Sequence, residues 1–183
     1  MEDSPSTERE TSCQYTQKMG SIANGFLKIN VDASYHEETR SGGWGVICRD
    51  NTHDIVIATA CPLEMMADAL HAEGTTLSHA IQVADQLGMG KVIFETDCIN
   101  LKHAMTTSEY EFTPIGVLVN DMKFRLQVNF IDASVVYAPR ACNKPAHELA
   151  ALGVGVAHGD HVIWSTSFPS SVTCLMTDDY TVF

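Results

Sequence analysis

Apolar and polar residues alternate along Leu27 to Ser34, which is the pattern of a β-strand with one apolar face. Asp32 comes near the end of this run, where a carboxylate needs a partner, a cation or water. Two more stretches have strand patterns, with a tight turn between them: Gly42 to Arg49 and Asp54 to Cys61. Because the connections are short, we expect the three strands to form an antiparallel meander.

The period changes from Met66 to Leu87, where apolar residues recur at intervals of three and four. This spacing predicts a long helix, which Gly88 and Gly90 would end. Strands are then predicted at Lys91 to Thr96 and Ala133 to Ala138. Helices are predicted at Cys98 to Met105 and Pro114 to Gln127, and a last helix begins after its cap Asn143 and runs to about Val156. The order β-β-β-α-β-α-α-β-α predicts an α/β fold with a mixed five-stranded sheet and helices on both faces.

The two ends of the chain differ from each other. Residues 1–24 are rich in Ser, Thr and Glu and have no periodicity, which predicts a disordered acidic and polar tail. Residues 25–158 are expected to form one domain, because a chain of 183 residues is long enough for one real core. Residues 159–183 are too apolar for a free tail, so we expect a C-terminal extension that packs on the domain.

The composition is that of an ordinary soluble domain, with 45% hydrophobic and 19% charged residues. No apolar run approaches the length of a transmembrane helix, so no membrane partner is expected. The first residues do not form a secretory signal, and the six scattered cysteines form no C-x-x-C pair. Reduced thiols and a nuclear or cytoplasmic protein are the expectation.

The net charge is −12, from 11 Lys and Arg against 23 Asp and Glu. This balance counts against strong non-specific binding of nucleic acid, which depends on neutralising phosphates. It leaves room for a local basic strip or for a metal site built from carboxylates.

Three acidic residues occupy unusual places in the pattern. Glu73 lies on the apolar stripe of the long helix, and Asp97 directly follows an apolar strand. Each has an ordinary alternative: Glu73 at the margin of the stripe with its carboxylate in solvent, Asp97 as a helix N-cap and Asp32 as a solvated strand end. The predicted sheet nevertheless brings the three together, where they would repel each other without a cation. Hard oxygen ligands suit Mg²⁺, with Mn²⁺ as a second candidate, and two such ions can promote phosphodiester cleavage.

His147 lies in the first turn of the last predicted helix. It could pair with water or with Glu148, or it could serve as a fourth metal ligand or a proton carrier. Arg140 and Lys144 lie just before it and are candidates for a local phosphate contact in this acidic chain.

Five motifs occur in order between Leu27 and Val156: KINVDAS, GGWGVICRD, HAEGTTLSHAI, VIFETDC and APRACNKPAHELA. Together they resemble the plant ribonuclease H-like family, which is related to the RNase H domains of reverse transcriptases. The resemblance implies a sheet with strand order 3-2-1-4-5 and Mg²⁺-dependent cleavage of the RNA strand in an RNA–DNA hybrid. It places the metal-binding acids on Asp32, Glu73 and Asp97. The expected catalytic set adds His147, and the expected substrate contacts are Ser34, Asn100, Arg140 and Lys144.

The chain departs from that family at three points. The fourth acidic position falls on His147, Gly74 stands where alanine is usual, and the basic helix and loop of many bacterial enzymes is absent between Met105 and Pro114. Two hypotheses therefore remain at this stage. One is an endoribonuclease that acts on RNA–DNA hybrids, and the other is a catalytically weak or inactive module that binds a protein or nucleic-acid partner.

Overall fold

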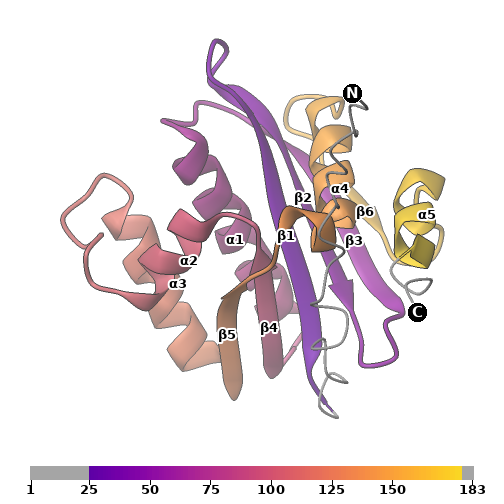
Figure 1. Cartoon of the computed structure of the whole chain (residues 1–183), viewed down its shortest axis with the longest axis horizontal. Helices are drawn as coiled ribbons and strands as arrows, with labels where there is room; N and C mark the ends of the chain where they lie inside the picture. Colours follow the sequence, from indigo (N-terminus) through magenta and orange to yellow (C-terminus); the bar gives the residue numbers. More distant parts are fainter. Residues whose placement is uncertain (1–24, 179–183) are drawn as a thin grey trace, which may run out of the picture.

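A computed structural model describes residues 25–178, and its centre is a six-stranded sheet with the order β5-β4-β1-β2-β3-β6 (Figure 1). The strands are β1 (Leu27–His36), β2 (Ser41–Arg49), β3 (Ile55–Leu63), β4 (Lys91–Thr96), β5 (Asp132–Tyr137) and β6 (Val162–Trp164). The helices are α1 (Ala69–Gln86), α2 (Ile99–Thr106), α3 (Gly116–Asn129), α4 (Lys144–Val154) and α5 (Ser170–Asp178), with a short 3₁₀ helix, η2 (Arg140–Cys142), before α4.

The predicted α/β fold and strand order are confirmed. β1, β2 and β3 pair antiparallel as a meander, and β4 and β5 continue the sheet on the other side of β1 in parallel. The predicted number of five strands is one too few. β6, in the segment after His158, pairs antiparallel with β3 and extends the sheet at that edge.

Helices cover both faces of the sheet, α1, α2 and α3 on one face and α4 and α5 on the other (Figure 1). The long predicted helix begins slightly later than the apolar pattern does, because the Asp68 side chain caps it by accepting from the backbone N–H of His71 at 2.7 Å. On the α1 side, buried apolar side chains such as Val31, Leu77 and Phe94 form the main core. A smaller cluster around Ile47 and Leu149 lies under α4 and α5.

Two glycines of β2 allow α4 to lie directly on the sheet. A Cβ atom on Gly45 would come 2.4 Å from the backbone oxygen of Ala146, and one on Gly43 would come 2.4 Å from the backbone oxygen of Ala150. No side chain fits at such distances, so the Gly-Gly-Trp-Gly sequence determines how closely α4 approaches the sheet. That closeness matters because α4 carries His147.

The tail predicted for residues 1–24 and the last residues, 179–183, lie outside the described part of the chain. Within it, Cys48, Cys61, Cys98 and Cys174 are not in disulfides, whereas Cys142 is disulfide-bonded, so the expectation of reduced cysteines is wrong at that position. None of the helices in residues 25–178 combines the length and the apolar character needed to cross a membrane.

Candidate metal centre

The three acids predicted to converge do so at one edge of the sheet. β1 and β4 are parallel neighbours whose last paired residues are Val31 and Thr96, so Asp32 and Asp97 follow directly and lie side by side. Glu73 reaches the same place from α1, which packs on β1. One carboxylate oxygen from each residue lies within 4.8 Å of the others.

The ordinary alternatives for these acids do not describe this geometry. Cys98, not Asp97, occupies the N-cap position of α2, and no side chain caps that helix. Asp32 is only 1% exposed and is not a solvated strand end. The Oε2 atom of Glu73 is buried and has no hydrogen-bond partner among the described residues, so the carboxylate is directed inward.

Burial and mutual repulsion hold two of the carboxyl groups toward their protonated forms. Burial and the charge of Asp97 together raise the pKa of Asp32 to about 6, against the opposing effect of the hydrogen bond with His147. Burial and the charges of Asp32 and Asp97 raise the pKa of Glu73 to about 9, and a hydrogen bond from the backbone of Ala33 opposes that rise. A cation at this point would reverse both effects by favouring the charged forms.

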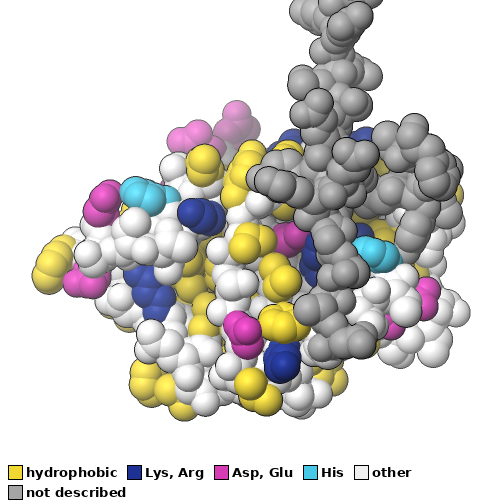
Figure 2. Space-filling model, turned by 60° about the horizontal axis from the view of Figure 1, so that its bottom comes forward, with side chains coloured by type: hydrophobic (Ala, Val, Ile, Leu, Met, Phe, Trp, Pro, Cys, Tyr) yellow, Lys and Arg dark blue, Asp and Glu magenta, His cyan; other side chains and the backbone are white. Residues whose placement is uncertain are grey.

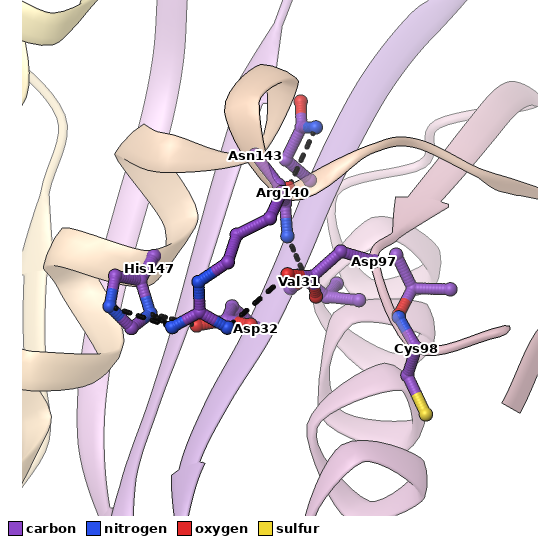
Figure 3. A network of polar contacts seen from close by, with 9 residues as sticks. Val31, Asp32, Asp97, Cys98, Arg140, Asn143 and His147 are labelled. Atoms are coloured by element: carbon purple, nitrogen blue, oxygen red, sulfur yellow. Dashed lines mark hydrogen bonds and ion pairs between the residues drawn. The ribbon is translucent and has the colours of Figure 1, made fainter. Parts of the chain in front are cut away.

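Arg140 and His147 close the outer side of the cluster (Figure 3). The Nδ1 atom of His147 lies 2.7 Å from Oδ2 of Asp32, and its Nε2 atom lies 3.1 Å from Nη2 of Arg140. The same Nη2 atom of Arg140 lies 3.2 Å from Nδ1 of His147, so the guanidinium faces both ring nitrogens while Nδ1 also contacts the carboxylate. Arg140 also reaches Asp97, with 3.7 Å between Nη1 and Oδ2. His147 therefore pairs with Asp32, and not with Glu148 as one alternative had it.

The other predicted substrate contacts lie on β1, α2 and α4 and do not bond to the acids. Ser34 is half-buried on β1 two residues after Asp32, Asn100 is exposed in the first turn of α2, and Lys144 is exposed at the first residue of α4. Within residues 25–178 no hydrogen bond or ion pair joins any of these three to the acidic cluster.

A buried polar network behind the site was not predicted. Asn30 donates to Glu95 at 2.8 Å and to Asn143 at 3.0 Å, and it accepts from Arg49 at 2.7 Å. Lys28 completes the network through an ion pair with Glu95 at 3.0 Å. The signal was present in the sequence: a strand in the middle of a sheet has two covered faces, so the polar residues alternating along β1 had to find partners.

The donor set of the three acids fits a hard divalent cation. It offers only carboxylate oxygens, one of them buried and unpartnered, and the charge that accumulates there needs compensation. Asp32, Glu73 and Asp97 could hold Mg²⁺ or Mn²⁺ at this edge.

The match to a family model agrees with this arrangement. The model of reverse transcriptase-like proteins matches residues 30–153, which is well over half of the chain. The chain belongs to the reverse transcriptase-like family. The matched residues include all three acids, Arg140 and His147, while the plant subgroup suggested by the motifs stays a prediction.

Solved structures show that the reverse transcriptase-like domain has the RNase H fold. It superposes on an RNase H1 from the halophilic archaeon Halobacterium salinarum with a TM-score of 0.62 and 20% identity, covering 73% of this chain and 100% of that one. The N-terminal RNase H domain of a Mycobacterium tuberculosis protein gives 0.63 and 18%, covering 71% and 94%. LC11-RNase H1, isolated from compost and solved in complex with an RNA/DNA hybrid, gives 0.64 and 16%, covering 70% and 96%. A search of curated proteins found no significant match.

Proposed function

We propose that this chain is a divalent-metal-dependent endoribonuclease that cleaves the RNA strand of RNA–DNA hybrids. The observation that carries the proposal is the convergence of Asp32, Glu73 and Asp97 at the edge between β1 and β4. The family supports it, and so does the fold shared with an RNase H1 solved on a hybrid.

Each residue of the site has a proposed role. Asp32, Glu73 and Asp97 would hold two Mg²⁺ or Mn²⁺ ions, which when bound activate water and stabilise the attacking and leaving oxygens of an in-line displacement. His147 would serve as a fourth ligand or would hold and release a proton at Nε2, since its Nδ1 atom faces Asp32. The hybrid would be contacted by Ser34, Asn100, Arg140 and Lys144. The positively charged side chains of Arg140 and Lys144 would bind its phosphates.

The test compares two substitutions that remove the same charge. Asp97→Asn should lower cleavage of a labelled hybrid by on the order of 100-fold or more, as expected when one charge-stabilising group leaves an active site. Asp132→Asn is the control, because Asp132 is exposed at the start of β5, at the end of the sheet away from the three acids. Cleavage should need Mg²⁺ or Mn²⁺ and stop with chelator, and full activity of Asp97→Asn would reject the site.

A second candidate is a binding module with weak or no catalysis, and the charge of the chain favours it. The chain has 11 Lys and Arg against 23 Asp and Glu, and on the face in Figure 2 the Lys and Arg side chains that are coloured lie singly or in small groups. A wild-type protein that binds Mn²⁺ and a hybrid but leaves the RNA intact would establish this function instead.

A further inference from the structure

Asn143 stands at the corner where η2 meets α4, and it is fully buried. The sequence predicts that Asn143 caps the last helix. It does occupy the N-cap position, but its side chain makes no cap hydrogen bond. The carboxamide turns to the sheet, where Nδ2 donates to the backbone oxygen of Val31 at 2.9 Å (Figure 3). Its Oδ1 atom accepts from Asn30 at 3.0 Å.

The partners of Asn143 are themselves fixed in place. Val31 directly precedes Asp32, so the hydrogen bond from Asn143 to the Val31 carbonyl holds β1 one residue before the acid. Asn30 is held on both sides, by Arg49 from β2 and by Glu95 from β4. Asn143 is thereby joined to three neighbouring strands through bonds that water does not reach.

The two residues that contact the acids lie one turn on either side of Asn143. The backbone N–H of Asn143 donates to the oxygen of Arg140 at 3.0 Å, and the backbone N–H of His147 donates to the oxygen of Asn143 at 3.1 Å. Any displacement of Asn143 therefore displaces Arg140 from Asp97 and His147 from Asp32.

From this geometry we propose that Asn143 is a positioning residue: its carboxamide fixes the corner between η2 and α4 to β1 and thereby sets the places of Arg140 and His147 at the acidic cluster. The two glycines of β2 fix how closely α4 lies on the sheet, and Asn143 fixes its first turn. The inference rests on the proposed nuclease function and adds to it a residue that never touches the substrate.

The kinetic test asks whether Asn143 acts through the two residues beside it. Asn143→Ala should lower kcat on a hybrid by about 10- to 100-fold, the range for groups that orient a site from behind it. In the background Arg140→Ala/His147→Ala, which keeps all three acids, the same change should alter kcat by less than about twofold, because residues acting as one unit are not additive. An equal loss in both backgrounds would overturn the proposal.

A spectroscopic test separates this inference from the nuclease function. The ring signals of His147 in NMR spectra at fixed pH should move in Asn143→Ala, because the ring loses its fixed distance to Asp32. Ile81→Val, which trims the main core away from α4, is the control for a general loss of stability and should leave the His147 signals in place. If Asn143→Ala does not fold, Asn143→Ser provides the same comparison.

The outcomes are distinguishable. A wild-type chain that cleaves no hybrid rejects the nuclease function, and the NMR comparison still tests the placing of His147. His147 signals that stay unchanged in the Asn143 variants reject the positioning role, even if the chain is an active nuclease.

Discussion

The two faces of β1 are equally hidden from water but are built from opposite kinds of residue. Toward α1 the strand presents Ile29 and Val31, which are fully buried and apolar. Toward α4 it presents Lys28, Asn30 and Asp32, which are at most 5% exposed. Burial of the apolar face stabilises the fold, because apolar side chains leave water. Burial of the polar face contributes little on balance, because each polar group must replace the hydrogen bonds that it made to water. The comparison shows that burial stabilises one face and orients the other.

The largest effect on stability is expected on the apolar face. Phe94 of β4 is fully buried and packs edge-on against Phe130, with 6.1 Å between ring centroids. Phe94→Ala should lower the free energy of unfolding by about 3–5 kcal/mol, since it leaves a cavity in the main core. Urea unfolding measures the loss. Folded Phe94→Ala should keep the metal-binding behaviour of the wild type, and a change below about 1 kcal/mol would contradict this account of the core.

A smaller effect on stability is expected on the polar face, where the cost of removing one charge depends on whether its partner is still present. Glu95→Gln keeps an acceptor for Asn30 but leaves Lys28 buried without its counter-charge, and should cost about 3 kcal/mol. The double variant Lys28→Met/Glu95→Gln removes the charge from both sides and should recover most of this cost. Urea unfolding of the wild type, Glu95→Gln and the double variant forms the test. A double variant no more stable than Glu95→Gln would show that the loss does not come from the unpaired charge of Lys28.

The pH dependence of stability distinguishes the acidic edge from both faces. Folding raises the pKa of Asp32 to about 6 and that of Glu73 to about 9, so the folded state binds protons more tightly than the unfolded chain does. Their contribution is complete below about pH 4 and is lost as pH rises toward 9, so the metal-free protein should lose stability over that range.

Glu73→Gln provides the matched control for this prediction. It removes the acid with the larger rise in pKa, so the difference in unfolding free energy between variant and wild type should widen in favour of the variant between about pH 4.5 and pH 9. Urea unfolding in chelator at several pH values measures it. Parallel stability curves for the two proteins would mean that Glu73 does not bind its proton in the way described.

The smallest effect concerns the packing of α1 on α3. Gly74 is buried within α1, and a Cβ atom there would lie 3.1 Å from Cδ1 of Ile115 and 3.2 Å from Cδ2 of Leu118. Both atoms end flexible side chains that can move by a few tenths of an ångström. Gly74→Ala should therefore stabilise the protein by up to about 1 kcal/mol through helix propensity. A higher midpoint of thermal unfolding would confirm it, and a lower one would show that α3 cannot move.

The sequence predicts the arrangement of elements well, because periodicity and short connections are local properties. The five predicted strands follow from these local patterns, whereas their order in the sheet was implied by the resemblance to a known family. The neighbouring positions of the first and fourth strands then predict the convergence of Asp32, Glu73 and Asp97. β6 is only three residues long, too short to show a period, and its strand character comes from pairing with β3. The role of Asn143 was also beyond local pattern. An asparagine before a helix predicts a cap, and only the approach of β1 gives its side chain better partners.

The distance along the chain between the paired residues also has a consequence for how the protein folds. Asp32 and His147 are 115 residues apart in sequence, and the strands β1 and β4 that align the acids pair in parallel across the whole of β2, β3 and α1. Contacts of such range require the closing of long loops and form slowly. The contact between His147 and Asp32 can therefore form only when the two ends of the domain have met. If the proposed metal site binds a cation, the gain of that binding during refolding should follow the pairing of β1 with β4, which brings Asp32 and Asp97 together.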